Sequence, residues 1–228
     1  MLETWGKAYA EAENRGHERS LGVIRRHWTI VGVVASLLAI ALLVVQATGL
    51  GETTRRAVTD ALQSDVIDDP RADEVVAIVN GQEIKRREIA AGVLFSTLEP
   101  GGDRLSPEEA LAAVIDQVLL TQAAHAAGIE VTDEEADQMV AAATQPFEDG
   151  TVSKDDVELM EQLFKASTGM TMDEAFASTE YREALADMLR RGRYIESTGK
   201  DRETLLAELR AEADIQIFED RVPEVAAK

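Results

Sequence analysis

The sequence predicts a mainly α-helical protein: a single N-terminal transmembrane helix, then a domain of five or six helices with one short strand at each end. Three observations carry this prediction. Residues 28–50 form an uncharged apolar run, amphipathic segments with helix-start signals recur between residues 85 and 213, and residues 75–79 and 215–218 have the apolar pattern of short strands. Aromatic residues make up only 4% of the chain, which suits helices packed by Ala and Leu better than a β-sandwich.

The apolar run 28–50, WTIVGVVASLLAIALLVVQATGL, is long enough to cross a membrane, because about 20 apolar helical residues span a hydrocarbon core. We favour an uncleaved signal anchor. The alternative is a cleaved signal peptide with Val45-Gln46-Ala47 as its cleavage site, but the run is longer than the apolar region of about 7–15 residues that such peptides carry. A buried core helix is a poor third reading, since core helices rarely lack charge over this length.

Flanking charges orient this segment and divide the chain. Four arginines lie within about 20 residues on its N-terminal side and two on its C-terminal side, which favours an N-terminus in the cytoplasm and a C-terminal domain outside the cytoplasmic membrane. We expect a cytoplasmic tail (1–27), the anchor (28–50), a spacer (51–74), a helical domain (75–218) and a short tail (219–228). The spacing of Gly32 and Ser36 within the anchor is compatible with a homodimer of two such helices.

Composition excludes several classes of function. After residue 50 the chain holds 39 Asp and Glu against 18 Lys and Arg, and this negative charge repels phosphate backbones, so nucleic-acid binding is not expected. The absence of cysteine excludes a thiol nucleophile, a disulfide framework and a zinc-thiolate site. The classes of partner that remain are therefore proteins and, through residues 28–50, membrane lipid.

The first strand should end in a tight hairpin. Residues 75–79 are β-branched or apolar, and Asn80-Gly81 supplies the two positive φ angles of a type I′ turn, followed by a very short return arm. A helix over residues 85–98 should bury Ile89, Val93 and Leu94. Ser106-Pro107-Glu108-Glu109 then opens the clearest helix of the chain, which Gly128 ends.

Similar start signals predict the remaining helices. Thr132 with Glu135 forms a capping box for a helix that ends at about Thr144, and residues 145–152 are expected to be a loop. Further helices are predicted over residues 153–168, 179–196 and 201–213, with a short helical turn at residues 171–176. The strand over 215–218 is too short to satisfy its own backbone, so we expect it to pair with the strand over 75–79.

Three stretches in this order resemble the N-terminal chaperone domain of the SurA/PrsA family of extracytoplasmic foldases, with trigger factor as a more distant relative. They are VVAIVNGQEI (75–84), VIDQVLLTQAAHAAGIEVTDEE (114–135) and LLAELRAEADIQIF (205–218). The resemblance implies a SurA N-terminal-like fold over residues 75–218. It also implies a domain that holds unfolded segments through apolar surface without ATP.

The chain departs from that family at one joint. Full-length members carry a parvulin prolyl-isomerase domain between the helical core and the returning terminal segment, whereas here residues 197–200 join the two directly. His125 is the one histidine of the domain, and we interpret it as a surface or half-buried residue rather than a catalytic base, because one titratable group without a partner does not make a site. We therefore expect no isomerase activity.

No other pattern indicates catalysis. The carboxylate pairs Asp155-Asp156 and Glu134-Glu135 stand at helix starts, where capping and the helix dipole account for them. No glycine-rich phosphate loop or histidine cluster is present in the sequence, and adjacent acids alone are not specific for a metal. We expect no catalytic residue, no metal and no cofactor.

The sequence thus leaves two hypotheses for function. The first is a membrane-anchored chaperone-like domain whose partners are unfolded or nascent secreted and membrane polypeptides. Its flexible methionines and aromatic rings would form a deformable peptide-binding groove, although helical spacing also predicts burial for each of them. The second is an accessory subunit that docks one specific membrane-protein partner. The candidate peptide-binding residues are Met139, Phe147, Met160, Phe164, Phe176 and Met188.

Overall fold

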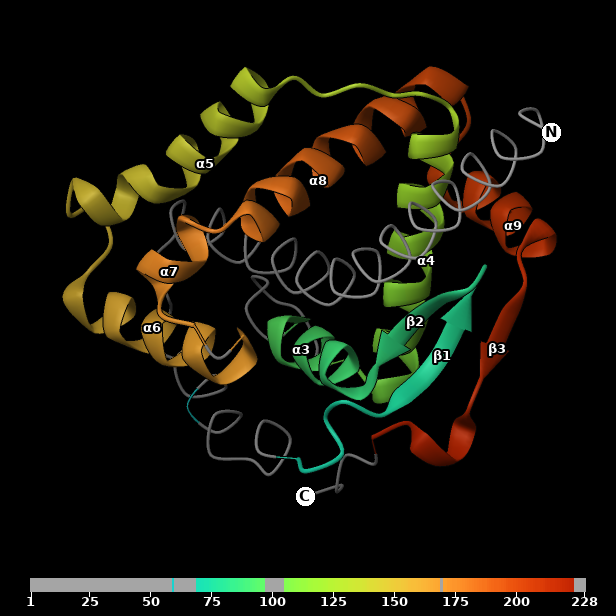
Figure 1. Ribbon diagram of the computed structural model, residues 1–228, viewed down its shortest axis with the longest axis horizontal. Coiled ribbons are helices and arrows are strands. Elements are labelled where there is room, and N and C mark those ends of the chain that lie inside the picture. Colours follow the sequence, from blue (N-terminus) through green and yellow to red (C-terminus); the bar gives the residue numbers. More distant parts are fainter. Residues whose placement is uncertain (1–58, 60–68, 97–104, 169, 224–228) are drawn as a thin grey trace, which may run out of the picture.

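The computed structural model describes residues 59, 69–96, 105–168 and 170–223 (Figure 1). These residues form seven α-helices, one 3-10 turn and one three-stranded sheet, so the predicted mainly helical class is confirmed. The helix number exceeds the expected five or six because the five-residue segment α7 is a complete short helix. The helices are α3 (Arg86–Ser96), α4 (Pro107–Ala126), α5 (Asp133–Glu148), α6 (Lys154–Thr168), α7 (Met172–Phe176), α8 (Thr179–Thr198) and α9 (Arg202–Glu212).

The sheet brings the two ends of the domain together. Strands β1 (Val75–Val79), β2 (Gln82–Lys85) and β3 (Ile215–Ile217) lie in the order β2-β1-β3, and both pairs are antiparallel. The predicted pairing of the first and last strands is confirmed. The hairpin turn is also confirmed, since Asn80 (φ 50°) and Gly81 (φ 81°) both adopt the left-handed backbone that a type I′ turn requires.

Asn80 links three parts of the fold through its side chain. Its amide nitrogen donates to Gln122 Oε1 on α4 at 2.8 Å, and its Oδ1 accepts from the backbone N–H of Asp214 at 2.9 Å. Gln122 in turn donates to the carbonyl of Val79 at 3.2 Å. The turn residue therefore fixes the hairpin against both α4 and the start of β3.

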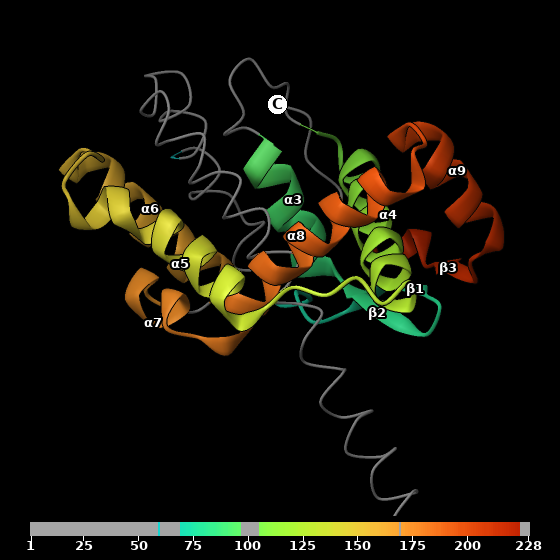
Figure 2. The ribbon, with the colours of Figure 1, turned by 90° about the horizontal axis from the view of Figure 1, so that it is seen from above.

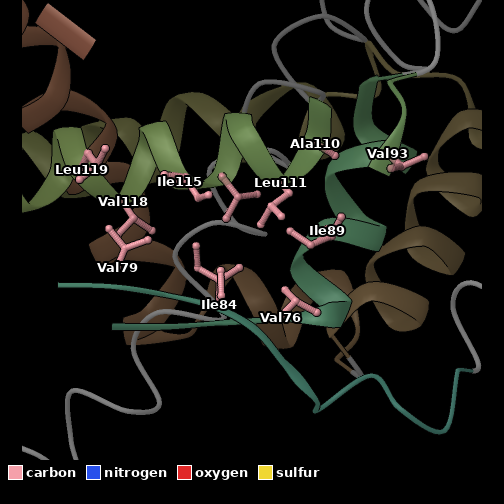
Figure 3. Packing of buried hydrophobic residues seen from close by; sticks show 12 residues of the cluster. Val76, Val79, Ile84, Ile89, Val93, Ala110, Leu111, Ile115, Val118 and Leu119 are labelled. Atoms are coloured by element: carbon pink, nitrogen blue, oxygen red, sulfur yellow. The ribbon is translucent and has the colours of Figure 1, made fainter. Parts of the chain in front are cut away.

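The main core lies between the sheet, α3 and α4. Figure 3 shows branched aliphatic side chains from these elements meeting on one face of the sheet. Helices α3 and α4 are in contact at Gly92, where an added Cβ would lie 3.4 Å from Ala110 Cβ, at ordinary contact distance. Ile89, Val93 and Leu94 are buried as predicted. The cluster consists of Val76, Ala77, Val79, Ile84, Ile89, Val93, Ala110, Leu111, Val114, Ile115, Val118 and Leu119.

Glu88 is buried inside this aliphatic region, at the start of α3. Its Oε1 accepts from the backbone N–H of Lys85 at 2.9 Å, while its Oε2 is buried with no hydrogen-bond partner among the described residues. Burial raises the pKa of the Glu88 carboxyl to about 8. The hydrogen bond from Lys85 and the charges of Lys85 and Arg87 lower the pKa, but burial has the larger effect. Near neutral pH this side chain is therefore mostly a neutral acid.

The segment before β1 is fastened to the C-terminal end of the domain. The guanidinium of Arg86 pairs with Asp69 and also donates to the carbonyl of Arg221 at 2.5 Å. Arg221 donates to the carbonyl of Val75 at 3.2 Å and lies 4.3 Å from the centre of the Phe218 ring. The last residues of the expected spacer, 69–74, thus pack with the domain.

Helix α8 runs between two groups of elements, as both ribbon views show (Figures 1 and 2). On one side lie the three strands, α3, α4 and α9, which we call the sheet module. On the other side lie α5, α6 and α7, which we call the arm. Leu120 on α4 packs with Leu205 and Leu206 on α9, and Asp116 on α4 pairs with Arg210 on α9 at 2.6 Å, so α9 is fixed to the sheet module.

One predicted boundary in the arm is wrong. Helix α5 continues through Pro146 to Glu148, whereas a loop was expected from residue 145. Proline lacks an N–H and cannot donate the usual bond to the carbonyl four residues earlier, but the helix continues past Pro146. The backbone N–H of Asp149 donates to the Gln145 carbonyl at 2.9 Å and that of Val152 to the Pro146 carbonyl at 3.1 Å, which closes the helix beyond the proline.

The predicted cytoplasmic tail (1–27) and membrane anchor (28–50) lie outside the described residues, as do the cleavage-site alternative and most of the spacer. Within residues 69–96, 105–168 and 170–223, no helix combines the length and the apolar character that crossing a membrane requires.

Candidate functional site

Four aromatic rings gather where the arm meets α8, and Phe176 on α7 lies at their centre. Its ring centroid is 5.5 Å from that of Phe164 on α6, 6.0 Å from that of Phe147 on α5 and 5.2 Å from that of Tyr181 on α8. We call these four residues the aromatic cluster. Edge-on and tilted ring pairs at these distances are favourable beyond the area they bury. One ring thus connects all three arm helices to α8.

The six candidate residues from the sequence divide into two classes. Met160 and Phe164 are completely buried, so they form the interior of the arm. The other four are only partly buried. Three of these, Met139, Phe176 and Met188, pack against the buried group of Tyr181, Ala184 and Leu185 on α8. The partly buried members are the side chains that lie at the surface of the arm and α8: Met139, Phe147, Phe176 and Met188.

Tyr181 belongs to this site although it was not among the six candidate residues from the sequence. Its side chain is 1% exposed, and its hydroxyl has no hydrogen-bond partner among the described residues. Burial raises the pKa of the Tyr181 hydroxyl above its usual value. A buried phenol without a partner is costly, so any rearrangement that lets this hydroxyl reach water or a peptide carbonyl recovers free energy.

Ion pairs hold α5 against α8 along the exposed margin of their contact. Arg182 on α8 donates to Asp133 at 3.1 Å and to Asp137 at 2.5 Å. Arg193 pairs with Glu135 and donates to the carbonyl of Glu130 at 2.7 Å. The Arg193 guanidinium, together with the Thr132 cap, lowers the pKa of Glu135 to about 2. Such exposed pairs are individually weak and screened by salt, so they permit small movements of α5 on α8.

His125 has a partner, which corrects the expectation that it stands alone. Its Nε2 lies 2.9 Å from Asp187 Oδ1 on α8, and Arg190 donates to Asp187 at 2.7 Å and to Glu183 at 2.6 Å. Burial tends to raise the pKa of Asp187, but the hydrogen bonds from His125 and Arg190 outweigh it and lower the pKa. One ligand atom each from His125, Glu183 and Asp187 lie within 4.8 Å of one another, yet the Arg190 cation binds both carboxylates, so this group is an ion-pair network between α4 and α8.

The acidic pairs at the helix starts have the capping roles predicted for them. Glu135 accepts from the backbone N–H of Thr132 at 2.9 Å, while the Thr132 hydroxyl accepts from the N–H of Glu135. Ser153 Oγ donates to Asp156 at 2.7 Å and accepts from its N–H at 3.2 Å. Both carboxylates cap their own helices, Glu135 also pairs with Arg193 on α8, and neither forms a converging site with other acids among the described residues.

Comparison with known families gives one match. The model of the SurA-like N-terminal domain matches residues 21–195, which begin before the apolar run and end within α8. No curated protein and no solved structure matches the chain. The matched region includes the whole arm and the aromatic cluster, but not α9 or β3.

Proposed function

The chain belongs to the SurA-like N-terminal domain family, and from this membership we propose that it is a chaperone-like protein that binds unfolded or extended polypeptide segments. The family match over residues 21–195 is the observation that carries the proposal, since it already suggests a chaperone-like or protein-binding role. The finer statements below rest on the arrangement of the arm and on the sequence before it.

The arm has the side chains that a promiscuous peptide-binding surface needs. Met139 and Met188 are flexible and polarisable, and Phe147 and Phe176 offer partly exposed rings. A client segment that inserts an apolar side chain beside Phe176 would exchange ring contacts within the cluster for contacts with the client. Burial of client surface supplies the free energy, so the cycle needs no ATP and no cofactor.

We place this activity at a membrane. The uncharged run 28–50 supports a single transmembrane signal anchor, and the excess of arginine before it supports a cytoplasmic N-terminus with the helical domain outside. A reporter enzyme that is active only outside the cytoplasm, fused after Lys228, should be active. The same reporter inserted after Ser20 should be inactive, and the opposite pattern would reverse the proposed topology.

We further propose that the domain has no prolyl-isomerase activity. The direct link between α8 and α9 at residues 197–200 leaves no room in the sequence for an inserted isomerase domain. A prolyl peptide assayed with the purified chain should isomerise at the uncatalysed rate. Turnover well above that rate would contradict this part of the proposal.

The decisive test is suppression of aggregation. The full chain in lipid nanodiscs should keep a chemically unfolded test protein soluble in proportion to its concentration, without ATP, and empty nanodiscs should not. No effect at several-fold excess would contradict a general chaperone. Affinity capture distinguishes the accessory-subunit hypothesis, because many unrelated clients support the chaperone and a single stoichiometric partner supports the adaptor.

A further inference from the structure

The outer edge of strand β3 is open. The sheet ends at β3 in the order β2-β1-β3, and no further strand of the described chain pairs with it (Figure 1). The cross-strand partners are Ala77 with Ile217 and Val79 with Ile215. The backbone N–H of Asn80 donates to the carbonyl of Asp214, and that of Phe218 donates to the carbonyl of Val76.

This register determines which backbone groups of β3 are available. In an antiparallel ladder, alternate residues exchange hydrogen bonds with the neighbouring strand, and the residues between them direct their N–H and C=O groups to the other side. Residues 214, 216 and 218 face β1, so the backbone N–H and C=O groups of Ile215 and Ile217 point away from the sheet. The 3-10 turn η1 (Glu219–Arg221) then leads the chain back towards β1, through the bond from Arg221 to Val75, and leaves this edge uncovered by the described residues.

The edge also presents apolar surface. Ile217 is 47% exposed and is the one large hydrophobic side chain among the described residues that is so exposed. Ile215, on the same face of the sheet, packs against the main core. An added strand would therefore continue the sheet and cover Ile217 with one of its alternate side chains.

Charge around β3 selects the occupant. Glu212, Asp214, Glu219 and Asp220 flank the strand, and all four are exposed, with no Lys or Arg between residues 212 and 220. If two copies of β3 paired antiparallel through Ile215 and Ile217, the acidic residues that flank β3 in one copy would come close to those of the other. Like charges brought together in this way repel, so the arrangement disfavours a second copy and favours a cationic segment.

We infer that the outer edge of β3 binds an extended polypeptide segment of the client by strand addition, and that it prefers an apolar segment flanked by Lys or Arg. This inference deepens the proposed function by giving a binding mode and a substrate class. The edge supplies main-chain hydrogen bonds that are independent of client sequence, while Ile217 and the acidic flanks supply the preference.

The test uses the full chain in nanodiscs and a fluorescent peptide, Lys-Lys-Val-Thr-Val-Thr-Val-Lys-Lys, measured by anisotropy. Binding should weaken about tenfold or more when the five central residues of the peptide are N-methylated, because the lost hydrogen bonds are worth about 1 kcal/mol each. It should weaken to a similar extent when Glu replaces every Lys. Equal binding of the N-methylated or the Glu-flanked peptide would overturn the inference.

A protein variant gives an independent arm of the experiment. Ile217→Pro removes an outward-facing N–H and the exposed isoleucine side chain but no hydrogen bond to β1, so β1 and β3 can remain paired, and it should weaken binding of the Lys peptide about tenfold. Glu158→Gln on the exposed side of α6 tests separately whether a negative charge outside the β3 edge affects binding of the cationic peptide, and it should leave the Kd unchanged. Unchanged affinity in Ile217→Pro overturns the inference, and the peptide comparison above decides the matter if this variant does not fold.

Two further results separate this inference from the proposed function. If sedimentation shows a wild-type dimer that Ile217→Pro converts to a monomer, the occupant is a second copy and the inference is overturned. If the wild-type chain suppresses aggregation but binds no Lys peptide, the edge is not the site, although the chaperone proposal stands. Failure of aggregation suppression by the wild-type chain defeats the proposed function itself.

Discussion

The sheet module and the arm lie on opposite sides of α8 and are stabilised in different ways. The sheet module is packed by branched aliphatic side chains that are almost fully buried and linked by strand pairing. The arm is packed by methionines and by Phe176 with the three rings around it, and the rings of Phe147 and Phe176 are partly exposed. Tight aliphatic packing gives a fixed frame, whereas flexible and partly exposed side chains allow rearrangement. The sheet module is therefore the fixed support, and the arm is the region that can rearrange.

The arm and α8 also differ in charge. Residues 133–177, which include the whole arm, contain twelve Asp and Glu but only Lys154 and Lys165, whereas α8 contains four arginines and four acids. Two of those arginines, Arg182 and Arg193, bind acids of α5. The negative charge that remains repels within the arm and opposes its compact packing.

The largest effect should follow from a cavity in the sheet module. Ile84→Ala removes a fully buried side chain on β2 and should lower the free energy of unfolding by about 2–5 kcal/mol. Phe147→Ala in the arm should cost less and should speed amide exchange mainly in α5 to α7. Urea denaturation and hydrogen exchange measure the two effects, and equal global destabilisation by both variants would abolish the distinction between the regions.

Glu88 should make the sheet module sensitive to pH. Its folded pKa of about 8 lies above its ordinary value of 4.5, so between these values the folded state holds a proton that the unfolded state has lost. Stability should therefore fall as pH rises from 5 to 8, on the order of 4 kcal/mol from about 1.4 kcal/mol per pKa unit. Glu88→Gln, which cannot ionise, should show a nearly flat profile by urea denaturation over this range. The same slope in wild type and variant would show that another group is responsible.

Removing one ring should weaken the arm and its binding together. Phe176→Leu keeps an apolar side chain but loses the three ring contacts, which should cost about 1–2 kcal/mol. Aggregation suppression should decrease in the same variant. Phe218→Leu is the matched control, since the Phe218 ring lies beside Arg221 outside the aromatic cluster. Unchanged stability and aggregation suppression in Phe176→Leu, or a loss of suppression only in Phe218→Leu, would contradict the role of the aromatic cluster.

The smallest effect should come from the ion pairs at the margin of the arm. Arg193→Gln removes the pair with Glu135 but leaves the Thr132 cap intact. The thermal midpoint should fall slightly at low salt, and the difference should shrink at 1 M NaCl because exposed pairs are screened. Lys154→Gln, at the exposed start of α6, provides the control for loss of a positive charge. A salt-independent loss in Arg193→Gln would indicate packing of the side chain rather than its charge.

Features encoded within a few residues could be predicted from the sequence. The Asn80-Gly81 turn, the capping box of Thr132 with Glu135 and the buried positions of α3 all depend on local spacing. The pairing of β1 with β3 followed from the requirement that isolated strands find partners. Helix α5 continues past its predicted end, and Phe147 beyond the proline packs against Phe176, a contact between helices that local sequence does not reveal.

The candidate site was less accessible to sequence reasoning. The methionines and phenylalanines were identified by residue type, but their type does not distinguish the buried Met160 and Phe164 from the partly exposed Met139 and Phe147. The hydrogen bond between His125 and Asp187 joins residues 62 positions apart, and no local sequence pattern predicts it. The open edge of β3 depends on strand order, which only the assembled sheet reveals.

Hydrogen–deuterium exchange of the full chain in nanodiscs, with and without an unfolded client, tests the central claim most directly. Without client, amides of α5, α6 and α7 should exchange faster than those of β1 and α4. Addition of reduced, carboxymethylated α-lactalbumin, which stays unfolded, should slow exchange in the arm and at Ile215 and Ile217 while leaving α4 unchanged. Uniform exchange across both regions, or no change on addition of the client, would contradict an adaptable client-binding arm on a fixed frame.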